Sequence, residues 1–266
     1  MLDVENIDEI VSEVGNGITE PFNAKIKDKH VIVKTFNNIE SNKVLANEII
    51  CYRIAKKIHL PMPNGGICDI KKGILINDNV EFNEERYGLG FYTDRLNKVT
   101  NIVNSTRVIQ KYVTNKEDLP RIILFDHLIY NKDRHKGNIL IDMATKNKKL
   151  HIIDHSHVFN LGPLWDEYQL RRFIDEKDYV SSEILEYNFP LYRLFFESMK
   201  IDLKLLKHHC EDFKNTLTVD FIQDSVNNLP KEWGISENEK SMLIEYILYR
   251  LTNLDRICSV IIEYIH

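Results

Sequence analysis

The stretch that most constrains the fold of this chain covers residues 125–159 and reads FDHLIYNKDRHKGNILIDMATKNKKLHIIDHSHVF. It contains Asp133, Asn138 five residues later, and Asp154 at the end of an apolar run. Two short apolar runs separated by a polar turn predict a β-hairpin over residues 139–153. Because a hairpin brings its two ends together, we expect Asn138 and Asp154 to lie near each other.

These side chains suit the transfer of a phosphoryl group from a nucleotide. That reaction needs a carboxylate beside the attacking hydroxyl, and oxygen ligands for the magnesium ion that bridges the phosphates. Asp133 suits the first role, and Asn138 and Asp154 suit the second. An Asp and an Asn at this spacing more often cap or turn the backbone. The prediction therefore depends on Asp154 at the end of the following hairpin.

Composition limits the classes of protein to which the chain can belong. With 266 residues, 43% hydrophobic and 28% charged, it can bury a large core as one domain or as two lobes. The net charge of −5, with no extended basic run, argues against nucleic acid as a partner. Charged residues interrupt the longest apolar stretches, so no membrane span is expected. The acidic start MLDVE does not resemble a signal peptide, which predicts a cytoplasmic protein.

A glycine-bearing loop and two strands lie near the N-terminus. Gly15 and Gly17 belong to the sequence VGNGITEP, and antiparallel strands are predicted over residues 22–26 and 30–34. Glycines let backbone amides approach phosphate oxygens closely, and Lys34 at the end of the second strand can neutralise them. Taken alone, the two glycines fit a β-turn better than a phosphate-binding loop.

A helix is predicted over residues 44–58, with Ser41 as its N-cap. Its apolar stripe consists of Val44, Cys51, Ala55 and Ile58. Glu48 falls on this stripe by the i, i+3 and i, i+4 rule. A carboxylate on the buried face of a helix requires a cation, and Lys34 lies on the strand just before. The sequence therefore predicts a Lys34–Glu48 ion pair.

The rest of the chain first continues with short strands and then becomes helical. A strand pair over residues 66–70 and 73–76 is predicted, then a strand from residue 87 and a lobe boundary near residue 95. Helices are predicted over residues 105–113, 117–130, 164–174, 181–199, 201–216, 219–228 and 236–265. The last helix begins with a capping box, Ser236 to Glu239. Its predicted buried stripe consists of Leu243, Ile247, Leu254, Ile257, Ile261 and Tyr264.

Four histidines near the same aspartates allow a different interpretation. A transition-metal hydrolase would use the ligand types of His135, His151, His155 and His157 together with these aspartates. No H-x-x-x-H pair appears on a predicted helix, however, and a hydrolase would leave Lys34 and Glu48 unexplained. The four cysteines are widely separated without a C-x-x-C pair, which predicts buried free thiols rather than a zinc site or disulfides.

Taken in order, the glycine-bearing loop, Lys34, Glu48, NKDRHKGN and IIDHSHVF resemble the protein-kinase-like fold. They are most similar to the HipA-like kinases, in the compact branch whose motif is roughly DRHxGN, then a strand, then IDH. The resemblance extends to ANEIICYRIAKKIHLPMP and NLPKEWGIS, so it covers most of the chain.

That resemblance implies a two-lobed α+β fold. Residues 1–95 would form a small β-rich N-lobe, and residues 96–266 a mainly helical C-lobe with the catalytic loop and the metal-binding hairpin. It also implies an ATP- and magnesium-dependent kinase that acts on serine or threonine hydroxyls of a protein substrate. A regulatory protein or an antitoxin would be a further partner.

The resemblance also implies roles for single residues. Lys34 would hold the α- and β-phosphates of the nucleotide, and Glu48 would orient Lys34. Asp133 would be the catalytic base, and Asn138 and Asp154 would hold magnesium.

Two segments depart from conventional protein kinases. The loop GNGITEP lacks their fuller glycine pattern, and Asp154 is followed by His155-Ser156-His157 instead of Phe-Gly. Switching by a conventional activation loop is therefore not expected. Two alternatives stay open: a small-molecule or lipid kinase, which shares the same Asp, Asn and Asp core, and a pseudokinase that binds nucleotide without turnover.

Overall fold

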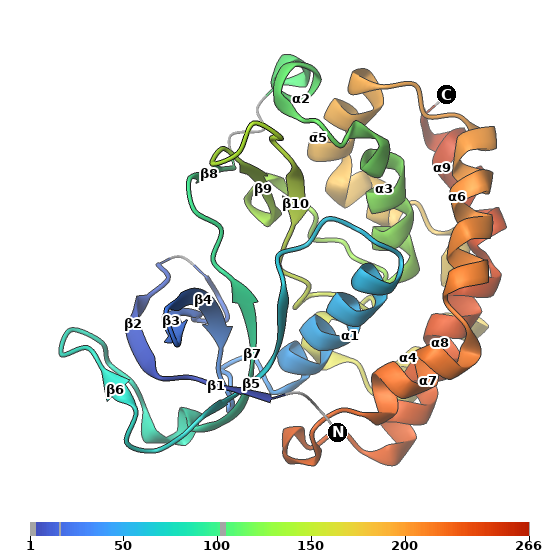
Figure 1. The fold of residues 1–266 in the computed structure, drawn as a ribbon. Coiled ribbons are helices and arrows are strands. Elements are labelled where there is room, and N and C mark those ends of the chain that lie inside the picture. The colour runs from blue at the N-terminus through green and yellow to red at the C-terminus, as the bar shows by residue number, and fades with distance from the viewer. Residues whose placement is uncertain (1–3, 16, 102–104, 266) are drawn as a thin grey trace.

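The computed structural model describes residues 4–15, 17–101 and 105–265. Figure 1 shows the strands of the N-terminal part curled together at one end, with helices filling the other end. Helix α1 (Lys43–Lys57) lies between these two parts. The mixed α+β architecture predicted from the sequence is confirmed. Asn16, in the glycine-bearing loop, lies outside the described residues.

The N-terminal sheet has the strand order β1-β5-β7-β4-β3-β2-β6. Its strands are β1 (Val4–Asn6), β2 (Glu9–Glu13), β3 (Phe22–Ile26), β4 (Lys29–Lys34), β5 (Gly65–Ile70), β6 (Leu75–Ile76) and β7 (Gly88–Asp94). Although β1 and β2 are consecutive in the chain, they lie far apart in this order. The residues between them hydrogen-bond to two strands that are distant in this order. Ile7 N–H donates to Asp69 O on β5 (3.0 Å), and Asp8 N–H donates to Lys25 O on β3 (2.9 Å). The sheet therefore curls around a core of its own, formed by Ile7, Ile10, Phe22, Ala24, Ile26, Val31, Val33, Cys68 and Ile70.

The predicted pairing of residues 66–70 with residues 73–76 is wrong. Strand β5 pairs with β1 and β7, whereas β6 pairs in parallel with β2. Both edges of β5 are occupied, so the following segment cannot fold back on it. Gly73, with φ +89°, allows the turn that leads the chain to the opposite side of the sheet.

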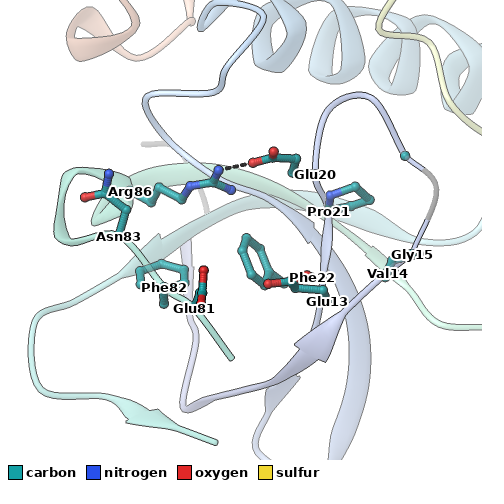
Figure 2. Close-up of a pocket in the computed structure, with 11 residues that line it drawn as sticks. Glu13, Val14, Gly15, Glu20, Pro21, Phe22, Glu81, Phe82, Asn83 and Arg86 are labelled. Carbon is teal, nitrogen blue, oxygen red and sulfur yellow. Dashed lines mark hydrogen bonds and ion pairs between the residues drawn. The ribbon is translucent and has the colours of Figure 1, made fainter. Parts of the chain in front are cut away.

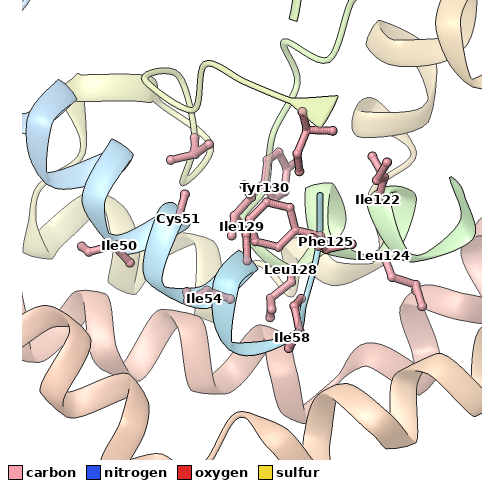
Figure 3. Packing of buried hydrophobic residues seen from close by; sticks show 14 of the residues in the cluster. Ile50, Cys51, Ile54, Ile58, Ile122, Leu124, Phe125, Leu128, Ile129 and Tyr130 are labelled. Carbon is pink, nitrogen blue, oxygen red and sulfur yellow. The ribbon is translucent and has the colours of Figure 1, made fainter. Parts of the chain in front are cut away.

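Helix α1 joins the sheet to the helical part. It packs against β5 and β7 and also against α7 (Val219–Asn227). In Figure 3 the side chains of Ile54 and Ile58 point toward Phe125 and Leu128. Ile54 is fully buried, and such burial contributes about 1.5–3 kcal/mol for one side chain.

The cap of α1 differs from the prediction by one residue. The N-cap is Asn42, not Ser41. Ser41 has φ +102°, and its Oγ accepts a hydrogen bond from Lys43 N–H (3.2 Å), so it belongs to the turn before the helix.

A second sheet has the order β10-β9-β8 and carries the predicted hairpin. Its strands are β8 (Val99–Thr100), β9 (Ile139–Asp142) and β10 (Leu150–Ile152). Ile139 pairs with Ile152, and Ile153 N–H donates to Asn138 O (3.1 Å). Because β7 ends at Asp94 and the next strand belongs to this second sheet, we propose the lobe boundary near residue 95.

The rest of the C-terminal part is mainly helical. Its helices are α2 (Thr106–Tyr112), α3 (Leu119–Leu128), α4 (Glu167–Asp175), α5 (Glu183–Ser198), α6 (Leu203–Thr216), α7, α8 (Glu237–Thr252) and α9 (Leu254–Ile265). The four cysteines are buried and free, as predicted. Within the described part of the chain, no helix is both long and apolar enough to cross a bilayer.

The last predicted helix is two helices, α8 and α9, separated at Asn253. The Asn253 side chain donates to Tyr249 O (2.8 Å), and its own N–H donates to Tyr249 O and Arg250 O. Asparagine side chains that bond to nearby backbone groups compete with helix continuation, and hydrophobic periodicity does not reveal this. The predicted capping box at Ser236 is present. The predicted stripe is buried except for Tyr264, which is 37% exposed.

Candidate active site

Lys34 is the meeting point of three elements. It ends β4, Glu48 lies on α1, and Asp154 follows β10. Its Nζ lies 2.5 Å from Glu48 Oε1 and 2.8 Å from Asp154 Oδ1. The structure thus brings Lys34 and Glu48 together, as the helical period predicts, and adds Asp154 to the pair.

Burial and charge set the protonation of this group. Burial works to lower the pKa of Lys34, but the carboxylates of Asp154 and Glu48 outweigh it and raise the pKa well above its usual value. Burial works to raise the pKa of Asp154, but the Lys34 ammonium and hydrogen bonds hold that pKa far below its usual range. For Glu48, burial prevails over Lys34 and raises the pKa. At neutral pH, Lys34 and Asp154 are therefore charged.

Ser156 belongs to the same cluster, and our sequence analysis did not assign it to the site. Its Oγ accepts from Lys34 Nζ (2.6 Å) and lies 2.6 Å from Asp154 Oδ1, to which it can donate. The side chain is buried. In the sequence, only its position two residues after Asp154 could have indicated that Ser156 belongs to the site, because no motif spacing includes this serine.

Asp154 has a backbone conformation that is uncommon for a residue other than glycine. Its φ is +58°, in the left-handed region, which a short polar side chain tolerates better than a branched one. Such conformations concentrate at functional sites. The hydrogen bonds that described residues make to this carboxylate all go to Oδ1. The side chain is 40% exposed.

Asp133 and Asn138 are joined by hydrogen bonds. Asn138 Nδ2 donates to Asp133 O (2.8 Å) and lies 3.4 Å from Asp133 Oδ2. Asn138 is buried, whereas the Asp133 side chain is 47% exposed. Because Asn138 also bonds to Ile153 N–H, it links Asp133 to the residue just before Asp154. The three residues of the initial motif are therefore gathered around one hairpin.

A buried arginine holds these segments in place. Arg134 donates to the Asp126 carboxylate at 2.9–3.2 Å, and its side chain and that of Asp126 are both fully buried. Its Nη1 also donates to Asn138 O (3.1 Å) and Ile153 O (2.9 Å), one at each end of the hairpin. Our sequence analysis did not single out this ion pair, although Asp126 lies in a mostly apolar helix that a lone buried carboxylate would destabilise.

Arg134→Met should destabilise the fold by about 3–5 kcal/mol, because Asp126 would be left as a buried unpaired charge. Arg172→Met is the control, since Arg172 pairs with Glu176 on the surface at 3.8 Å and its loss should cost less than about 1 kcal/mol. Urea unfolding of both variants measures the difference. Equal losses would mean that the Arg134 pair does not hold the hairpin.

The histidines do not assemble a metal centre. His155 Nε2 lies 2.8 Å from Arg134 Nη2, which can only donate, so this nitrogen accepts and the ring is neutral. Burial and Arg134 hold the pKa of His155 well below its usual value. Across the described residues, no group of three or more His, Cys, Asp or Glu side chains is arranged to hold a metal. The donor set that a hydrolase would need is therefore not formed by them.

The glycine-bearing loop lines a cavity of about 660 Å³. Figure 2 shows Gly15 and Pro21 on one side of this cavity and Arg86, paired with Glu20, on the other. A Cβ at Gly17 would meet Pro21 Cδ at 2.7 Å, whereas a Cβ at Gly15 would meet open space. The cavity lining includes both glycines but none of Lys34, Asp133, Asn138 and Asp154. The contact of Gly15 and Gly17 with nucleotide phosphates therefore stays a prediction.

The residues around the hairpin fit a magnesium–nucleotide complex. Magnesium prefers carboxylate and other oxygen ligands, and it is usually bound through one or two carboxylates together with substrate phosphates. Asp154 has one carboxylate oxygen engaged by the protein and an exposed side chain, and Asn138 supplies an amide oxygen nearby. The Lys34 ammonium supplies a positive charge next to them.

Comparison with known proteins places these features in a family. A family model described as HipA-like kinase matches residues 7–259. No curated protein sequence matches the chain. The crystal structure of the proinflammatory kinase CtkA of Helicobacter pylori matches with a TM-score of 0.61 and 14% identity, over 98% of this chain and 99% of that one. At that identity the likeness shows a shared fold.

A second solved structure is that of HipA from Shewanella oneidensis MR-1, in a toxin–antitoxin complex with HipB and operator DNA. It matches with a TM-score of 0.41 and 14% identity, over 92% of this chain and 65% of that one.

Proposed function

Because this chain belongs to the family of HipA-like kinases, we propose that it transfers the γ-phosphate of ATP, with magnesium, to a serine or threonine hydroxyl of a protein. The observation that supports this best is the contact of Lys34 with both Glu48 and Asp154. In protein kinases the lysine–glutamate ion pair and the metal-binding aspartate must both be in place for transfer. Here all three side chains meet.

In this proposal, Lys34 contacts the α- and β-phosphates, and Glu48 keeps its ammonium in position. Asn138 and Asp154 hold magnesium, which when bound neutralises charge on the phosphates. The exposed carboxylate of Asp133 accepts the proton of the acceptor hydroxyl. Its hydrogen bond to Asn138 keeps this carboxylate beside the magnesium-binding residues.

The loop that contains Gly15 and Gly17 contributes backbone amides to the phosphates in the same proposal. Two contacts anchor this loop to the rest of the N-terminal part. Asn38 Nδ2 donates to Thr19 O (2.8 Å), and Glu20 pairs with Arg86. An anchored loop loses less conformational entropy when a nucleotide binds.

Radiolabelled ATP with magnesium tests the function and the acceptor together. The protein is incubated with itself and with cell lysate, and separately with sugars, aminoglycosides and lipid head groups. We expect label on serine or threonine of protein. Label on a small molecule or lipid alone would replace the proposed acceptor. ATP binding without transfer to any class would identify a pseudokinase.

A regulatory partner protein, such as an antitoxin, belongs to the same proposal because the family resemblance implies one. Affinity purification of the tagged full chain, with and without ATP, tests for it. A partner that lowers phosphate transfer when added back is the expected result, and a chain that purifies alone under both conditions would argue against it.

Lys34→Ala and Glu48→Ala should each weaken ATP use, and the double variant should be little worse than either alone. The reason is that the two side chains act through one ion pair, so removing the second adds little. The coupling free energy from kcat/KM of the four proteins should fall within about 0.5–3 kcal/mol. Fully additive effects would mean that each side chain acts independently.

A further inference from the structure

One buried asparagine of α1 contacts the segment after Asp154, residues 155–165, at three places. Asn47 is fully buried. Its Nδ2 donates to Ser156 O (2.6 Å) and to Gly162 O (3.3 Å), and its Oδ1 accepts from Trp165 Nε1 (2.9 Å). One side chain therefore contacts the beginning, the middle and the end of this segment.

Asn47 stands directly before Glu48, and neighbouring groups reinforce its contacts. One turn earlier on α1, Lys43 Nζ donates to Trp165 O (2.5 Å) and lies 4.5 Å from the centre of the Trp165 ring. Glu48 Oε1 accepts from His155 N–H (3.1 Å). Helix α1 cannot move away from Asp154 without breaking these bonds.

The same segment offers no exposed hydroxyl for phosphorylation. It reads HSHVFNLGPLW, in which Ser156 is the only hydroxyl residue. Ser156 is 1% exposed and its Oγ already bonds to Lys34 and Asp154. In conventional protein kinases, phosphorylation of the corresponding segment orders it and positions the helix that carries the glutamate. Here the bonds from Asn47 can supply that order.

We propose that Asn47 is a positioning residue for phosphate transfer, which holds α1 and residues 155–165 in register so that Glu48 and Asp154 both meet Lys34 without phosphorylation of that segment. This rests on the proposed kinase function. Asn47 itself touches none of the reacting groups. Its burial costs free energy unless its amide is hydrogen-bonded, and its three bonds to the segment meet that requirement.

Asn47→Leu tests the proposal, because leucine keeps the size of the side chain and removes all three bonds. We expect faster amide hydrogen exchange in residues 155–165, weaker magnesium-dependent ATP binding, and a kcat lower by about 10²-fold, the effect of misplacing reacting groups by about 1 Å. Phosphatase treatment of the parent should leave its rate unchanged.

Arg53→Met is the matched control on the same helix. Arg53 donates to Ser225 O (2.6 Å) and Asn228 O (3.4 Å), so it also ties α1 to the helical part, but not to residues 155–165. It should lower thermal stability without changing exchange in that segment or kcat. Trp165→Phe is a milder variant, since it removes one donor to Asn47, and it should shift exchange and kcat in the direction of Asn47→Leu by a smaller amount.

Unchanged exchange and kcat in both Asn47→Leu and Trp165→Phe would overturn the proposal, as would loss of activity on phosphatase treatment. If Arg53→Met and Asn47→Leu change exchange and kcat equally, Asn47 only stabilises the fold in general, and the proposal is also overturned. Exchange and nucleotide binding are measured without an acceptor. If the parent protein binds ATP but transfers no phosphate, the proposed function is contradicted. Hydrogen exchange and nucleotide binding then still decide the role of Asn47.

Discussion

Asp133→Asn is expected to lower phosphate transfer by about 10²- to 10⁴-fold, or roughly 3–5 kcal/mol of barrier, while ATP and magnesium still bind. The amide keeps the shape of the carboxylate but cannot accept a proton. The hydrogen bond from Asn138 to the main-chain oxygen of residue 133 does not involve the altered group, so the loop should keep its conformation. The measurement is ATP affinity by calorimetry beside the rate of transfer.

Asp142→Asn provides the control for this substitution. Asp142 lies on the same hairpin, where its carboxylate accepts from Ala144 N–H (2.8 Å) in the turn. We expect its transfer rate to match that of the parent. An unchanged rate in Asp133→Asn as well would refute the assignment of Asp133 as the base.

Asp154→Ala should abolish turnover and remove the magnesium dependence of ATP binding. The substitution removes the carboxylate that we assign to the metal, while Glu48 and Ser156 still hold Lys34. Alanine is disfavoured at the φ of +58° observed here, so Asp154→Asn is a second variant that tolerates this conformation better. Titration of ATP with and without magnesium measures the effect, and circular dichroism checks the fold.

Variants of Asp133 and of Asp154 should give different results in these ATP titrations. Asp133→Asn should keep the magnesium dependence of ATP binding, and both Asp154 variants should lose it. If an Asp154 variant binds ATP with the same magnesium dependence as the parent, Asp154 is not a metal ligand.

Properties that depend on neighbouring residues could be predicted from the sequence. The apolar runs around a polar turn predicted the β9–β10 hairpin, and the helical period of α1 placed Glu48 on its buried face. The type of each residue then indicated its chemistry, since a buried carboxylate requires a cation. The Lys34–Glu48 pair was predicted on that basis, whereas the contact of Lys34 with Asp154 was seen only in the structure.

Features decided by competition between distant partners could not be predicted in this way. The strand pattern of β5 and β6 was recognised, but their pairing was not, because β1 and β7 occupy both edges of β5. The stripe of the last helix continued through Asn253, where α8 ends and the asparagine side chain bonds to the preceding turn.

The sequence by itself determined which reactive groups are present and how they are spaced along β4, α1 and the β9–β10 hairpin. Only the tertiary structure decided which buried polar groups support them. Asn47 bonds to residues more than a hundred positions away, Ser156 completes the contacts of Lys34, and Arg134 joins both ends of the hairpin. A buried polar group must find a hydrogen-bond partner, but how the helices and sheets pack decides which partner it meets.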